Sequence, residues 1–262
     1  MLLLLILIKV IQFLAGAALF SFFDVLVWRL PRKESFLWGR SHCESCGAVL
    51  SPWNLIPVIS WLLLRGRCRF CGAKIPLRCL GMELAGGAAS WLVVWRFDRN
   101  GEIPQGFLGA SWEAWWALVL LGLLVVVARL DLDTGLIPNR LNLALLCWGV
   151  LAGFLFPVPS WGERLVGAVC VSVPMWLLCM AVPEAFGGGD IKLMAAAGMI
   201  LGWKKILLAF FLALVSGGAA AAGLLLSGKV QRKDHLAFGP YLCAGIGIAL
   251  LFGDEILAWY LG

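Results

Sequence analysis

The sequence predicts an all-α protein that crosses a membrane several times. Of its 262 residues, 62% are hydrophobic and only 14% are charged, whereas a soluble domain carries roughly a quarter charged residues. Apolar runs of about twenty residues, the length that crosses the hydrocarbon layer of a bilayer, recur along the whole chain. The composition therefore argues against a soluble protein and leaves a membrane enzyme, a transporter or a channel.

Eight apolar segments predict about eight transmembrane helices. Their expected ranges are 2–28, 80–96, 112–130, 139–157, 163–183, 191–202, 205–227 and 238–261. The sixth segment is too short to span a bilayer as a straight helix, so we expect it to pair with the seventh or to be partly re-entrant. The first segment has no basic start and ends in the basic run Trp28–Lys33, so it predicts a retained helix rather than a signal peptide.

The basic residues predict how these helices are oriented. The formal net charge is +6, and nine of the 21 basic residues lie between Arg29 and Arg78, where Glu34 and Glu44 are the only acids. The positive-inside rule therefore places this loop in the cytoplasm and the N-terminus outside. The other inner loops are then 129–139, 184–191 and 228–237. Because the charge follows membrane topology, we expect membrane lipids and no nucleic acid as partners.

Four of the nine cysteines form two pairs with the spacing of metal-binding turns. Cys43 and Cys46 make the first pair, Cys68 and Cys71 make the second, and 21 residues separate the two pairs. Four thiolates predict the closed tetrahedral shell of a structural zinc ion, which would supply most of the folding energy of this short loop. Two disulfides or four unengaged thiols are the alternatives. The cytoplasmic location disfavours the first and the paired spacing disfavours the second.

Acidic residues stand at two ends of predicted helices, where an ionisable group is costly. Asp131 and Asp133 follow the third segment, and Asp190 precedes the sixth after three glycines. Two carboxyl groups in contact cannot both ionise easily, so one can keep a proton while the other accepts one from water, as in an aspartic peptidase. Salt bridges with Arg129 and Lys192, or helix capping by Asp131 and Asp133, explain these acids equally well. A proton-coupled transporter that relays protons through them is a further alternative.

Several blocks in a fixed order lead to a family. They are Ser21–Pro31, Arg40–Cys46, Asn54–Ser60, Arg65–Cys71, Glu83, Leu130–Asn139, Gly187–Leu193 and Phe238–Tyr241. Together they resemble the motifs of the bacterial prepilin peptidases, also called type IV leader peptidases, over almost the whole chain. The block Leu130–Asn139 is similar to the family's Ile-Asp-x-x-Thr-x-x-Leu-Pro-Asp, and Gly187–Leu193 is similar to its Gly-x-Gly-Asp-x-Lys-Leu.

The resemblance implies an activity and its residues. It places Asp131, rather than Asp133, at the family's first catalytic aspartate and Asp190 at the second. Members cleave the basic leader of prepilins and pseudopilins at the cytoplasmic face of the bacterial inner membrane, and many then methylate the new N-terminus with S-adenosylmethionine. The resemblance therefore implies both peptidase and N-methyltransferase activity.

The methyl-transfer activity has weaker sequence support. Phe20, Asp24 and Glu44 stand where the family has glycine, asparagine and proline, and no glycine-rich cofactor fingerprint is visible. Glu83 is the candidate for binding S-adenosylmethionine, and a buried salt bridge is its alternative role.

The predicted parts follow from these assignments. We expect a first transmembrane helix at 1–30, a cytoplasmic four-cysteine zinc loop at 31–79, a second helix with an outer loop at 80–111, and a six-helix aspartic peptidase domain at 112–262.

Overall fold

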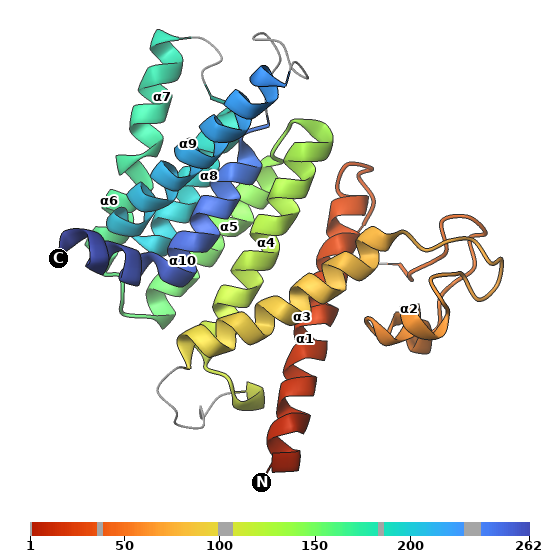
Figure 1. Ribbon diagram of the computed structural model, residues 1–262. Helices are drawn as coiled ribbons and strands as arrows, with labels where there is room; N and C mark the ends of the chain where they lie inside the picture. Colours follow the sequence, from red (N-terminus) through yellow and green to blue (C-terminus); the bar gives the residue numbers. More distant parts are fainter. Residues whose placement is uncertain (1, 36–38, 99–106, 183–185, 228–236) are drawn as a thin grey trace. The chain divides into compact units, whose positions relative to one another are not determined.

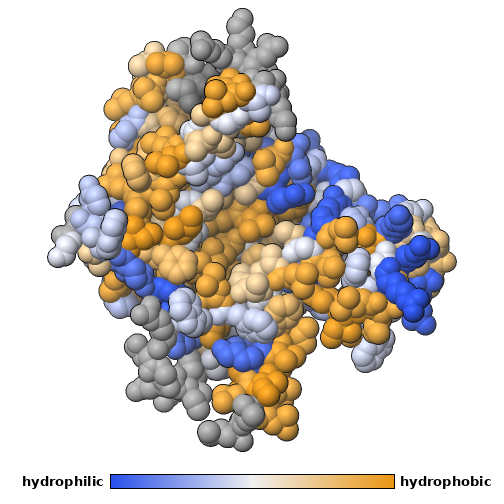
Figure 2. All heavy atoms as spheres, viewed as in Figure 1, coloured by the Kyte–Doolittle hydropathy of each residue, from blue (hydrophilic) through white to orange (hydrophobic). Residues whose placement is uncertain are grey.

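The chain is almost entirely helical (Figure 1). The computed structural model describes residues 2–35, 39–98, 107–182, 186–227 and 237–262. These ranges contain no β-strand and only two isolated β-bridges. Six helices are long and apolar enough to cross a membrane, and hydrophobic side chains cover much of the helical surface (Figure 2). The predicted all-α membrane class is therefore confirmed.

Helical structure forms in each of the eight predicted apolar segments. In chain order the helices are α1 (Leu2–Arg29), η1 (Pro52–Leu55), α2 (Ile59–Leu63), α3 (Leu77–Phe97), η2 (Phe107–Gly109), α4 (Trp112–Thr134), α5 (Asn139–Leu155), α6 (Trp161–Cys170), α7 (Ser172–Ala181), α8 (Gly188–Leu201), α9 (Trp203–Leu226) and α10 (Gly239–Leu261). The fifth segment is interrupted at Val171, between α6 and α7. The predicted inner loops 184–191 and 228–237 lie partly outside the described residues.

The helix α4 extends further than predicted. We expected it to end at residue 130, whereas it continues to Thr134 and so contains Asp131 in its last turn. The hydroxyl of Thr134 donates to the carbonyl of Leu130 at 2.7 Å, and the N–H of Gly135 donates to the carbonyl of Asp131 at 2.8 Å. Because Gly135 has a φ of +65°, it ends the helix in the left-handed conformation that glycine adopts without strain.

Two compact units make up the chain, Met1–Gly122 and Leu123–Gly262. In the first unit, α1 packs against α3. A Cβ atom added to Gly16 would collide with the carbonyl oxygen of Gly86, so the two backbones approach as closely as glycine allows. The hydroxyl of Ser90 also donates to the carbonyl of Gln12 at 3.0 Å. These contacts hold together the two helices that carry the cysteine loop between them.

In the second unit, α8 lies at the centre. It contacts α9, as expected, and also α5, α6, α7 and α10. At Gly198 of α8, an added Cβ would collide with the backbone of Gly167 in α6. Protein rather than lipid therefore surrounds this short helix, which removes the need for it to span the bilayer.

Arg164 satisfies the helix ends around α8. Its side chain is 1% exposed, and its guanidinium donates to several backbone carbonyls. The acceptors are Ala152, Phe156, Pro159, Met199 and Ile200. Met199 and Ile200 lie in the last turn of α8, where carbonyls have no partner within their own helix. A buried cation thus fixes the end of α8 opposite Asp190.

Candidate active site and cysteine centre

Asp131 points into the second unit from the last turn of α4. It is 6% exposed, and its Oδ2 accepts a hydrogen bond from the backbone N–H of Gly239 at 2.9 Å. Gly239 begins α10. A Cβ atom added to Gly239 would lie 2.6 Å from the same Oδ2, so any other residue would displace the carboxylate. The Phe238–Tyr241 block therefore supplies a backbone donor, a role that its sequence did not suggest.

Asp190 lies in the first turn of α8 and is 7% exposed. Its Oδ2 accepts from the N–H of Gly187 at 3.3 Å, which caps the helix start. Burial, and next the charge of Asp131, raise the pKa of Asp190 to about 6. The fold has thus brought these two carboxyl groups, which come from separate helices, close enough to influence each other electrostatically.

The neighbouring charges have other partners. Arg129 lies 3.9 Å from the carboxylate of Asp133, and both side chains are about half exposed. Lys192 Nζ donates to the Oδ1 of Asn139 at 2.8 Å. The salt-bridge alternative therefore describes Asp133, whereas Asp131 binds a backbone N–H.

Asn142 is a residue of this site that sequence analysis missed. It is 5% exposed, and its Nδ2 donates to the carbonyl of Gly189 at 3.1 Å. Its Oδ1 is buried without a hydrogen-bond partner among the described residues, an arrangement that costs free energy. An amide inside an apolar helix was the available signal. Asn142 connects α5 to the backbone just before Asp190.

Aromatic rings lie next to the two glycines whose N–H groups donate to the aspartates. Phe238, directly before Gly239, has its ring centroid 5.8 Å from that of Phe186, directly before Gly187. Phe186 also contacts Phe210 of α9, at 6.3 Å between centroids, and Phe238 contacts Tyr241 at 6.4 Å. This aromatic cluster joins the two segments that position the aspartates.

The four cysteines gather at one point in the first unit. The Sγ atoms of Cys43, Cys46, Cys68 and Cys71 all lie within 4.8 Å of one another, and those of Cys43 and Cys71 are 3.9 Å apart. A zinc ion with Zn–S bonds of about 2.3 Å would place its sulfurs about 3.8 Å apart. All nine cysteines, which lie within the described residues, are free thiols. The structure therefore does not contain the disulfides of the alternative interpretation.

Two turns of the same design make this cysteine centre. In the first, the N–H of Cys43 donates to the carbonyl of Ala48 at 2.9 Å, and the N–H of Gly47 donates to the carbonyl of Cys43 at 2.8 Å. In the second, the N–H of Cys68 donates to the carbonyl of Ala73 at 2.8 Å, and the N–H of Gly72 donates to the carbonyl of Cys68 at 3.0 Å. Gly47 and Gly72 have positive φ, +68° and +72°.

The backbone around the first turn also favours a thiolate. The N–H groups of Cys46 and Ser45 lower the pKa of Cys43 to about 6. The pKa of Cys71 is instead raised to about 11, because the N–H of Ala73, which lowers it, is outweighed by burial and then by hydrogen bonds with the other three thiols. A lowered pKa favours the thiolate form that binds metal. The sulfur spacing therefore carries the case for a structural zinc ion.

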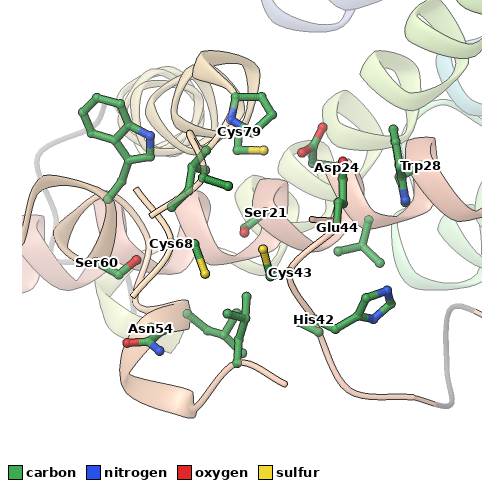
Figure 3. A pocket seen from close by; sticks show the side chains of 18 of the residues that line it. Ser21, Asp24, Trp28, His42, Cys43, Glu44, Asn54, Ser60, Cys68 and Cys79 are labelled. Atoms are coloured by element: carbon green, nitrogen blue, oxygen red, sulfur yellow. The ribbon is translucent and has the colours of Figure 1, made fainter. Parts of the chain in front are cut away.

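A cavity of about 310 Å³ adjoins the cysteine centre. Ser21, Asp24 and Trp28 of α1 line it, facing the cysteine loop and Cys79 of α3 (Figure 3). Glu44, a second position at which the chain departs from the family motif, lines it as well. The cavity therefore combines carboxylates, an indole and the cysteine turns.

Glu83, which lines this cavity, also holds an unusual turn at Val58. It accepts hydrogen bonds from the hydroxyl of Ser21 at 3.1 Å and from the N–H of Val58 at 2.7 Å. Val58 has φ +62° and ψ −49°, a conformation that is rare for a β-branched residue. The partners of Glu83 are thus a hydroxyl and a backbone N–H, rather than the basic side chain of the salt-bridge alternative.

Comparison with known proteins gives a consistent result. Residues 14–97 match the Bacterial Peptidase A24 N-terminal domain, and residues 118–222 match the Type IV leader peptidase family. Curated relatives named prepilin leader peptidase/N-methyltransferase occur in several bacteria. That of Bacillus subtilis is 33% identical over 251 residues, covering 96% of this chain and 97% of the relative.

Two further relatives carry the same name. The protein of Aeromonas hydrophila is 36% identical, covering 85% of this chain and 74% of the relative. That of Pseudomonas aeruginosa is 30% identical, covering 95% and 91%. No solved structure matches the chain. These matches favour a peptidase over the proton-coupled transporter.

Proposed function

The chain belongs to the type IV leader peptidase family and is a membrane peptidase with N-methyltransferase activity, and on that premise we propose that Asp131 and Asp190 cleave the leader of a prepilin or pseudopilin. The observation that carries the proposal is that two buried carboxyl groups, one from the end of α4 and one from the start of α8, lie close enough for the charge of Asp131 to raise the pKa of Asp190. No third ionisable group is needed for the chemistry.

The mechanism follows from two carboxyl groups that share one proton. The ionised member takes a proton from water, whose oxygen then bonds to the scissile carbonyl carbon. The other member delivers its proton to the nitrogen of the departing amine as the C–N bond breaks. The two aspartates can exchange roles. The N–H of Gly239 holds Asp131, and the start of α8 holds Asp190.

The substrate lies partly in the bilayer in this proposal. Its apolar segment occupies the inner membrane, and its leader enters the cytoplasm, where the basic loops of the enzyme lie. The aromatic cluster of Phe186, Phe210, Phe238 and Tyr241 then borders the residues next to the scissile bond.

Single substitutions test the aspartates. Asp131→Asn and Asp190→Asn should each abolish the size shift of a prepilin incubated with the purified enzyme. In either variant the remaining aspartate faces an amide, with which it cannot share a proton. Asp133→Asn is the matched control, since that exposed carboxylate is paired with Arg129. Substantial cleavage by Asp131→Asn or Asp190→Asn, with the protein inserted and folded, would reject the assignment.

We assign methyl transfer to the cavity beside the cysteine centre. S-adenosylmethionine carries a sulfonium cation, and the carboxylates of Asp24 and Glu83 suit a cation. The indole of Trp28 already contacts the guanidinium groups of Arg32 and Arg78. When bound, S-adenosylmethionine supplies the methyl group that the new N-terminal amine accepts. Glu83 also keeps the turn at Val58 in place, so its contribution is partly to shape the cavity.

Mass spectrometry of the processed substrate separates the two activities. Glu83→Gln should lower methylation while the cleavage position and rate stay unchanged, and it should weaken binding of radiolabelled S-adenosylmethionine. Equal methylation by the variant and the parent enzyme would remove Glu83 from the cofactor site.

The four cysteines bind a structural zinc ion in this proposal. With four sulfur ligands the metal has no open position for water, so it supplies folding energy to the loop and no chemistry to the reaction.

A further inference from the structure

The cysteine loop exposes an apolar surface on the segment Pro52–Leu63. Trp53, Leu62 and Leu63 are 78%, 60% and 79% exposed. The side chains of Leu55 and Ile59, at 45% and 41%, extend the same segment. Large apolar side chains gathered in this way mark a surface that contacts a partner or a membrane.

Unneutralised positive charge lies next to this surface. Arg65, Arg67, Arg69 and Lys74 are all exposed, and none of them forms an ion pair within the described part of the chain. Residues 45–82 contain no acid at all. Figure 2 shows hydrophobic surface around α2 beside strongly hydrophilic surface of the same loop.

The loop is also tethered where a bilayer surface must be. Both α1, which precedes it, and α3, which follows it, are long and apolar enough to cross a membrane. The chain leaves α1 at Arg29 and enters α3 at Leu77, and the loop belongs to the same compact unit as these two helices. The two helices therefore hold its apolar segment close to lipid.

We propose that the segment Pro52–Leu63 lies in the headgroup region of this bilayer, while Arg65, Arg67 and Arg69 bind anionic phospholipid headgroups. Apolar side chains beside cations are the pattern of interfacial membrane segments. Each basic residue near an anionic surface strengthens binding about fivefold. Positive charge without nearby acids matches anionic lipid better than it matches a second, equally basic copy of this loop.

Hydrogen–deuterium exchange in nanodiscs tests this proposal. The full-length protein is placed in nanodiscs of phosphatidylcholine alone or of phosphatidylcholine with phosphatidylglycerol. Backbone exchange in residues 52–64 should be several-fold slower with phosphatidylglycerol. The double variant Arg67→Gln/Arg69→Gln should lose this difference. Lys33→Gln/Arg40→Gln, which removes two exposed charges elsewhere in the same loop, should keep it.

A second variant separates lipid from protein partners. Leu62→Ser/Leu63→Ser should speed exchange in both kinds of nanodisc, while exchange in α3 stays unchanged as evidence that the unit is folded. Exchange that is equal in both lipids and unaffected by either double variant would overturn the proposal. Protection that rises with protein concentration would also overturn it, in favour of a second copy of the chain.

Discussion

The cysteine centre and the aspartate pair are assembled over very different lengths of chain. Two local turns, each closed by hydrogen bonds within six residues, present the four thiols. The ends of three helices, α4, α8 and α10, together position Asp131 and Asp190. A site made by turns depends on its own ligands. A site made by helix ends depends on how α8 packs among its neighbours.

The largest effect is expected from substitutions that disrupt the cysteine centre alone. Cys43→Ser/Cys68→Ser removes two ligands from a centre whose zinc would contribute on the order of 10 kcal/mol to folding. The loop should lose its metal and become rapidly cleaved in limited proteolysis, while α4 to α10 stay folded. Metal analysis and peptide mapping provide the measurement.

Cys147→Ser is the control for that experiment, since Cys147 is an exposed thiol in α5. Unchanged proteolysis of the cysteine loop in the double variant would mean that the loop folds without a metal.

The next effect tests the dependence of the aspartates on α10. Gly239→Ala adds a Cβ 2.6 Å from Asp131 Oδ2, which must push the carboxylate or the helix aside at about 1–3 kcal/mol. We expect kcat/KM for prepilin cleavage to fall about 10–100-fold. Gly218→Ala is the control, because its Cβ would meet nothing within 4 Å. Parent-like cleavage by Gly239→Ala would show that the contact is unimportant.

A smaller effect is expected at Asn142. In Asn142→Leu the carbonyl of Gly189 loses its donor, but the unpartnered Oδ1 disappears too, so the free energy of unfolding should change by less than about 1 kcal/mol. The looser backbone before Asp190 should lower kcat about tenfold with KM unchanged. A change in thermal stability without a change in kcat would assign Asn142 a purely structural role.

The smallest effect concerns the exposed pair of Arg129 and Asp133. Arg129→Gln removes a contact of 3.9 Å between half-exposed side chains, which contributes about 0.5 kcal/mol or less. Neither cleavage nor the midpoint of thermal unfolding should change measurably. A marked loss of cleavage would show that Arg129 contacts the substrate instead.

Features set by residues close together in the chain were predicted correctly more often than features set by packing. The helical class and the gathering of the four cysteines are confirmed, because hydrophobic length and turn spacing are local properties of the chain. The end of α4 was misplaced by one turn, since a chain of hydrogen bonds through Thr134 and Gly135 extends the helix past its last apolar residue. The interruption at Val171 was also missed.

By itself the sequence determined which segments are apolar enough to become membrane helices and which turns can present thiols to a metal, because both depend on residues close together in the chain. Only the tertiary structure decided which acid is buried. Asp131 and Asp133 are two residues apart, so they point to nearly opposite sides of α4. The packing of α8 and α10 buries Asp131. The donors from Gly239 and Asn142 lie too far along the chain for any spacing rule to connect them with the aspartates.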